Sequence, residues 1–152
     1  MIAAVSPEGV IGLGNALPWN HPGDLKRFMQ VTTGATVAMG RLTFESMRSK
    51  PLPRRRNIVI TSRAIAGVEC VASVAAAVAL GADPLWFVGG ARVFAEAMRV
   101  ADIIDLTYVP DHVSDPHAVH FPPIDESVFE PGPLLVHENE PELRRRIYTR
   151  RG

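Results

Sequence analysis

Gly89 and Gly90 mark a place where the chain could bind a phosphate. They follow a short apolar run, Leu85–Val88, and precede a stretch with helical spacing, Ala91–Arg99. Glycines let backbone approach a ligand closely, and the first turn of a helix offers unpaired N–H groups to an anion. The spacing is not that of the dinucleotide fingerprint, and no phosphate-loop lysine follows. A tight strand-to-helix turn without a ligand explains the same residues, so the motif alone leaves both interpretations open.

A second junction of this kind lies at Gly40, where Arg41 and Thr43 would occupy the first turn of a helix. The planar guanidinium of arginine suits a phosphate, although a solvated arginine at a helix start is an equally simple interpretation. Three consecutive arginines, residues 54–56, precede an expected strand and could bind a carboxylate or phosphate. A solvated turn is the alternative there.

Asp24 is a carboxylate at the start of an amphipathic stretch, Gly23–Thr32, whose apolar side includes Leu25, Phe28 and Met29. Asp24 and Phe28 are four residues apart and share a helix face. A carboxylate among apolar neighbours favours a cationic or amidine-like partner that hydrogen-bonds both oxygens. The alternative is an aspartate that serves the helix dipole.

The composition limits the kinds of molecule that the protein is expected to bind. Sixteen basic and sixteen acidic residues cancel, which argues against a nucleic-acid or membrane-surface partner. Residues 1–63 nevertheless carry nine basic and three acidic residues, which fits either an anionic ligand or charges that pair across a sheet. One cysteine, Cys70, and five histidines without ligand spacing predict no disulfide and no metal site. No signal peptide or membrane-spanning stretch is present, so we expect a cytoplasmic protein.

Short β-branched runs alternate with helical stretches along the chain, which is typical of an α/β fold. We expect one domain over residues 1–152, with a mixed, mostly parallel eight-stranded sheet, about four helices on both faces, and an antiparallel C-terminal strand pair. We expect a long loop over residues 110–133. The predicted helices are Gly23–Thr32, Arg41–Met47, Ser73–Gly81 and Ala91–Arg99, and the predicted strands are Ile2–Val5, Thr36–Met39, Asn57–Thr61, Glu69–Val71, Leu85–Val88, Ile103–Val109, Leu134–Asn139 and Leu143–Thr149.

The order of these motifs along one chain closely resembles bacterial dihydrofolate reductase, strongly as far as Thr107 and weakly beyond it. The segments that carry the resemblance are Ile2–Ala4, Val10–Gly12, Leu17–Asn20, Asp24–Phe28, Met39–Ser46, Pro51–Asn57 and Val88–Val93. The resemblance implies NADPH-dependent reduction of dihydrofolate to tetrahydrofolate, by hydride transfer from the nicotinamide to the pterin. It also implies a monomer that binds diaminopyrimidine-type inhibitors.

The resemblance assigns Asp24 to the pterin, with Trp19 positioning a water and Thr107 joining the same network. Arg55 would bind the glutamate carboxylate of the folate tail, although Arg54 stands where many members have glycine, so this choice depends on the register from Asn57. The expected substrate-binding residues are Ile2, Ala4, Asp24, Leu25, Phe28, Met47, Leu52, Arg55, Val88 and Thr107.

The same resemblance implies a cis peptide between Gly89 and Gly90 and a mobile loop over residues 12–21. Arg41 and Arg63, with no acid expected nearby, would select NADPH over NADH. The expected cofactor-binding residues are Ala3, Ile11, Asn15, Leu17, Gly40, Arg41, Leu42, Thr43, Thr61, Ser62, Arg63, Gly89, Gly90, Ala91, Arg92, Val93 and Phe94.

Two other functions fit parts of the pattern. A riboflavin-pathway pyrimidine reductase shares the fold, cofactor and Gly-Gly turn, but generally lacks an acid at the position of Asp24. A non-catalytic nucleotide-binding module would not need the pterin-side residues. Asp24 with Pro18 and Trp19 therefore favours dihydrofolate reduction.

Overall fold

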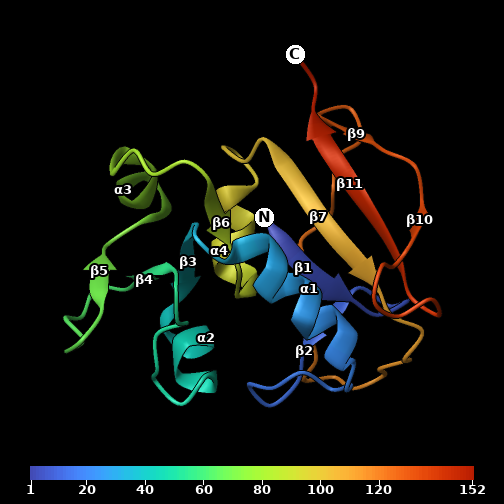
Figure 1. Ribbon diagram of the computed structural model, residues 1–152, viewed down its shortest axis with the longest axis horizontal. Helices are drawn as coiled ribbons and strands as arrows, with labels where there is room; N and C mark the ends of the chain where they lie inside the picture. The colour runs from blue at the N-terminus through green and yellow to red at the C-terminus, as the bar shows by residue number, and fades with distance from the viewer.

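The computed structural model describes residues 1–152 and has the α/β architecture that the sequence predicts (Figure 1). No helix has the length and hydropathy needed to cross a membrane. The helices are α1 (Pro22–Thr32), α2 (Arg41–Ser46), α3 (Val74–Ala79) and α4 (Ala91–Ala97). The strands are β1 (Ile2–Val5), β2 (Val10–Gly12), β3 (Thr36–Gly40), β4 (Arg56–Ile60), β5 (Glu69–Val71), β6 (Leu85–Phe87), β7 (Ile103–Tyr108), β8 (Val119–His120), β9 (Phe129–Pro131), β10 (Leu135–Val136) and β11 (Arg144–Arg150).

Backbone hydrogen bonds divide the expected sheet into two larger sheets. One is parallel, in the order β5-β4-β3-β6, and the other is mixed, with β1-β7-β11-β10 in order and β9 also on β11. Figure 1 shows the mixed sheet on the right and the parallel sheet on the left. The expectation of a single eight-stranded sheet is therefore wrong in one respect, because β6 and β1 belong to different sheets.

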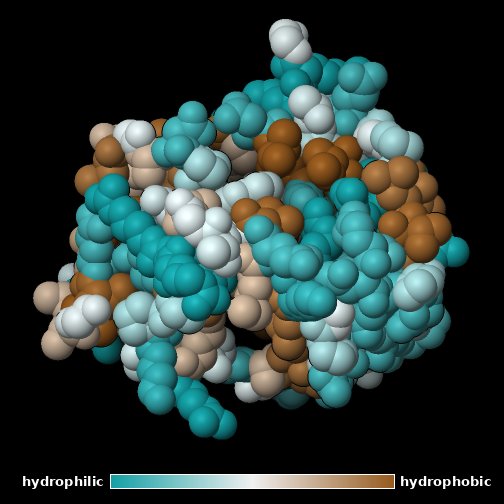
Figure 2. Space-filling view, viewed as in Figure 1, coloured by the Kyte–Doolittle hydropathy of each residue, from teal (hydrophilic) through white to brown (hydrophobic).

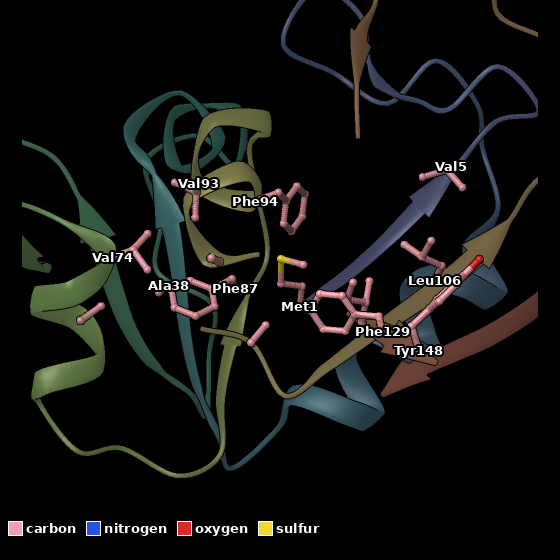
Figure 3. Packing of buried hydrophobic residues seen from close by; sticks show 14 of the residues in the cluster. Met1, Val5, Ala38, Val74, Phe87, Val93, Phe94, Leu106, Phe129 and Tyr148 are labelled. Atoms are coloured by element: carbon pink, nitrogen blue, oxygen red, sulfur yellow. The ribbon is translucent and has the colours of Figure 1, made fainter. Parts of the chain in front are cut away.

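Side chains rather than backbone pairing join the two sheets. Met1 lies between Phe87 and Phe94 on one side and Phe129 on the other (Figure 3), and all four belong to one buried cluster. The Phe94 ring also contacts that of Phe121, with centroids 4.9 Å apart. Burying such large apolar side chains is the main term that stabilises a core of this kind.

The antiparallel C-terminal pair is confirmed, with Leu135 of β10 opposite Arg145 of β11. The long loop expected over residues 110–133 is partly wrong, because it contains β8 and β9. β8 pairs with β2, with His120 opposite Val10, and β9 pairs with the end of β11. These strands have two or three residues, too few to show a period-two pattern in sequence.

The expected apolar side of α1 is the main error in the local prediction. Leu25 and Met29 are 50% and 44% exposed, whereas Arg27 is only 7% exposed. Asp105 of β7 accepts two hydrogen bonds from Arg27, from Nη1 at 3.0 Å and from Nη2 at 2.7 Å. A buried charge is tolerated when it is paired in this way, and sequence periodicity cannot show a partner 78 residues away.

Candidate functional site

Two strand-to-helix junctions meet at the centre of the molecule. β3 leads into α2 through Gly40, and β6 leads into α4 through Gly89 and Gly90; the Gly40 N–H donates to the Gly89 carbonyl at 2.8 Å. The peptide between Gly89 and Gly90 is cis, as the resemblance implies. Gly89 has φ +140°, and a Cβ there would lie 3.2 Å from Thr43 Oγ1. Glycine is therefore required at this turn both by conformation and by the close approach of α2.

Two cavities open on either side of this turn. One, of about 290 Å³, lies toward β1 and the segment after β2, and the other, of about 520 Å³, lies toward the ends of β3 and β4. Figure 2 shows the surface hollowed between the part that bears α2 and the part that bears α1. Sixteen of the seventeen expected cofactor residues line one cavity or both, and Arg63 is the exception. Ala4 and Val88, expected on the substrate side, also line the smaller cavity.

The arginines of the larger cavity have acidic partners. Arg41 Nη1 lies 2.6 Å from Glu45 Oε1, one helical turn further along, so the expectation that no acid stands near Arg41 is wrong. Arg92 Nε lies 3.6 Å from Glu96 Oε1, and the Arg92 side chain is 94% exposed. Exposed pairs of this kind are weak, so both guanidinium groups can turn toward an incoming phosphate at low cost.

Asp24 sits in the first turn of α1 and faces β7. Thr107 Oγ1 donates to Asp24 Oδ1 at 2.7 Å, as the predicted network requires. His137 Nε2 lies 3.0 Å from the same oxygen. Sequence reasoning missed His137, since nothing local to it indicates a partner 113 residues away. No hydrogen bond joins Trp19 to Asp24; Trp19 is half-buried in the segment before the helix.

The other apolar residues expected to bind the substrate come from both larger sheets and the segments beside them. Ile2 is buried at the start of β1, and Ala4 lies opposite Thr107 in the β1–β7 register. Met47, Leu52 and Val88 pack at the edge of the core formed by Val37, Met39, Phe44 and Val59. Leu17, Leu25 and Leu42 are 49%, 50% and 59% exposed. All three were expected to contact a ligand, and their exposure fits a surface that a ligand covers.

Arg55 is distinguished from its two neighbours by its contacts. Its guanidinium lies 5.9 Å from the centroid of the Phe28 ring, and Nη1 donates to Thr32 Oγ1 at 3.1 Å. Burial, and secondarily the charge of Arg54, lowers the pKa of Arg55. Arg56 instead binds Glu69 through two hydrogen bonds of 2.9 Å. The structure thus places one of the three arginines, Arg55, beside the helix that carries Asp24.

Only one group of side chains has the types and spacing that could hold a metal. His21, Glu140 and Glu142 bring ligand atoms within 4.8 Å of one another near the start of α1. His21 Nε2 is occupied by Asp111 Oδ1 at 2.6 Å, and Nδ1 lies 3.5 Å from Glu140. These contacts connect the end of the segment over residues 12–21 to the loops that carry Asp111 and Glu140.

Comparison with known proteins gives one consistent result. The family model described as dihydrofolate reductase matches residues 1–142. Dihydrofolate reductase of Neisseria meningitidis serogroup A is 43% identical over 132 residues, covering 84% of this chain and 80% of that protein. Dihydrofolate reductase of Mycobacterium tuberculosis strain H37Rv is 39% identical over 114 residues, covering 72% and 70%. The structure of dihydrofolate reductase from Enterococcus faecalis, complexed with NADP(H) and RAB-propyl, superimposes with a TM-score of 0.85 at 32% identity, covering 99% and 95% of the two chains.

Proposed function

Because the chain belongs to the dihydrofolate reductase family, we propose individual roles in dihydrofolate reduction for the residues that meet at its cleft. The enzyme reduces dihydrofolate with NADPH, which excludes the pyrimidine reductase and the non-catalytic module as its main function. NADP(H) is the cofactor, and it supplies the hydride when bound.

Asp24 binds the pterin. The observation that carries this assignment is its carboxylate, fixed by Thr107 at 2.7 Å and bordered by the exposed apolar side chain of Leu25. Oδ1 accepts from Thr107 and pairs with His137, while no protein group donates to Oδ2, so Oδ2 is the oxygen open to a donor of the pterin. The negative charge of Asp24 favours protonation of the bound ring. We assign to Trp19 the role that the family resemblance implies, which is to order a water beside Asp24.

The turn at Gly89 and Gly90 holds the pyrophosphate and nicotinamide. The close approach of Thr43 to this turn leaves a backbone surface that any side chain would fill, which fits a ligand that packs against main chain. Arg41, Thr61 and Ser62 line the larger cavity and provide the polar and cationic groups for a phosphate. Arg63 lies outside that lining, and its backbone N–H donates to Thr61 Oγ1 at 3.1 Å.

Arg55 binds the glutamate end of the substrate. Its partly buried position against Phe28 makes the guanidinium less hydrated than that of Arg54, and Thr32 holds it in place. Arginine in such a setting binds a carboxylate through two parallel hydrogen bonds.

Binding of a diaminopyrimidine tests the role of Asp24 apart from catalysis. Asp24→Asn is expected to weaken binding at pH 7 by at least tenfold, since a charge-assisted pair becomes a neutral one. The matched control is Asp111→Asn. This variant also removes a carboxylate that is hydrogen-bonded to a histidine, His21, at 2.6 Å, but Asp111 is not one of the expected substrate-binding residues. Titration calorimetry should show unchanged NADPH affinity for Asp24→Asn. Equal losses in the two variants would contradict the assignment.

We also propose that the chain is one domain that acts as a monomer in the cytoplasm. One buried cluster includes residues of both larger sheets, which supports a single domain. Light scattering coupled to size exclusion should give a mass near 16.5 kDa, and a mass of twice that value would contradict the monomer.

A further inference from the structure

His137 is a buried polar side chain that contacts Asp24, and its hydrogen bonds define its tautomer. Its side chain is fully buried, and Nδ1 accepts from the backbone N–H groups of Asn139 at 3.1 Å and Glu140 at 3.2 Å. A ring nitrogen that accepts from N–H groups carries no proton of its own, so we assign the proton to Nε2. Nε2 therefore donates to Asp24 Oδ1, 3.0 Å away.

This arrangement excludes a proton relay through the ring. A relay would need Nδ1 to take up a proton while Nε2 released one, but Nδ1 faces two backbone donors. His137 is thus built as a permanent hydrogen-bond donor to the carboxylate, and any effect that it has on the reaction must pass through Asp24.

Two donors then converge on one oxygen of Asp24. Thr107 reaches Oδ1 from β7 and His137 reaches it from the turn between β10 and β11. A carboxylate oxygen has two in-plane lone pairs, so the two donors saturate Oδ1 and fix the plane of the group. Oδ2 remains as the acceptor for a ligand.

We infer that His137 is a positioning residue of this enzyme, which orients Asp24 and holds it in the form that accepts the pterin. The inference depends on the proposed role of Asp24 and deepens it. Donation to a carboxylate stabilises its charged form and opposes proton uptake by the Asp24–pterin pair. Because reduction needs a proton in that pair, we expect loss of the His137 donor to extend the reaction to higher pH.

The other charged groups near this pair come from five parts of the fold. Arg27 of α1 binds Asp105 of β7 and also Glu138, which follows His137. Arg145 of β11 binds Glu138 as well. His21 and Glu140 lie on the opposite side of the turn, 3.5 Å apart. A substitution of His137 removes none of these charges, but it also removes the acceptor of the Asn139 and Glu140 N–H groups. A change in pH dependence is therefore assigned to the lost donor by comparing a variant that keeps an N–H group with one that does not.

The test is the pH dependence of hydride transfer in single-turnover experiments with NADPH and dihydrofolate. His137→Leu removes the donor. We expect the pH midpoint of the fall in rate to rise by about one unit, which corresponds to the loss of about one charge-assisted hydrogen bond. His137→Gln retains an N–H near the position of Nε2 but cannot titrate, so its midpoint should return toward that of the wild type. His117→Leu is the control, because His117 is exposed.

Each outcome is decisive. An unchanged midpoint in a folded His137→Leu enzyme would overturn the inference. So would pH profiles in which His137→Leu and His137→Gln both lose the same pH-dependent phase of the rate, since that would mean that the ring itself titrates. If His137→Leu does not fold, nitrogen chemical shifts of the wild-type ring decide: a protonated Nδ1 at pH 7 would overturn the inference. Near-normal turnover of Asp24→Asn would instead contradict the proposed role of Asp24. In the Asp24→Asn background, His137→Leu should produce no further shift.

Discussion

Removing one partner of the buried ion pair between Arg27 and Asp105 should cost more stability than removing one partner of any other pair in the molecule. Both residues are at least 93% buried, at 7% and 2% exposure, and their two hydrogen bonds measure 3.0 and 2.7 Å. Asp105→Asn would leave a guanidinium in the core with one remaining partner, Glu138, at 3.0 Å. Loss of one member of a buried pair costs about 3–5 kcal/mol. Because Glu138 is half exposed and still neutralises Arg27 in part, we expect a value of about 3 kcal/mol.

The chain offers a matched control on its surface. Arg56 and Glu69 are also joined by two hydrogen bonds, from Nε and Nη2 and both 2.9 Å long, but both residues are exposed to solvent. Glu69→Gln should change the free energy of unfolding far less, because water screens the pair and hydrates the arginine that is left.

Urea denaturation, followed by tryptophan fluorescence and by circular dichroism, measures both variants. The midpoint concentration should fall strongly for Asp105→Asn and little for Glu69→Gln, with the same dependence on urea. The double variant Arg27→Leu/Asp105→Leu should recover most of the loss, since it leaves no uncompensated charge. Equal destabilisation by Asp105→Asn and Glu69→Gln would refute the argument that burial decides the strength of these pairs.

Three further predictions concern ligands and pH. Arg55→Leu should raise KM for dihydrofolate with little change in kcat, because binding of the glutamate end is the same in the ground and transition states. Arg54→Leu should have little effect. A larger rise in KM for Arg54→Leu than for Arg55→Leu would contradict the assignment of Arg55 to the glutamate end. Arg41→Ala should reduce the preference for NADPH over NADH in kcat/KM by about tenfold, and an unchanged preference would exclude a phosphate contact. Burial alone would raise the pKa of Glu138, but its bond to Arg145 and the charge of Arg27 lower it overall. The stability that Glu138 adds is then complete above its ordinary value of 4.5 and is lost as pH falls below it, so the unfolding curves of wild type and Glu138→Gln should converge in acid.

The cofactor side of the cleft could be predicted from sequence because its signals are local. Gly40 and the Gly89–Gly90 pair stand where strands end and helices begin, and each junction is complete within about ten residues. Their meeting in space follows from β3 and β6 being parallel neighbours, with Ala38 opposite Phe87. The cis peptide could be expected only through family resemblance, because no local pattern favours it.

The environment of Asp24 was harder to predict from the sequence, because its hydrogen-bond partners lie far away along the chain. Thr107 was expected from resemblance, whereas His137 and Arg27 were not expected at all. The helix pattern predicted an apolar face that included Leu25 and Met29, yet the ion pair of Arg27 takes the buried position. Such polar contacts depend on pairs more than 75 residues apart, which periodicity does not record.

The central claim is that the Asp24 carboxylate binds the pterin and assists its protonation. Single-turnover hydride transfer from NADPH to dihydrofolate, measured for wild type and Asp24→Asn from pH 5 to 8, tests it most directly. We expect the variant to be slower at pH 7 by about two or more orders of magnitude and to recover as pH falls, because solvent then supplies the proton. NADPH binding should stay unchanged. A rate near that of the wild type at pH 7, or a loss that is the same at every pH, would contradict the account.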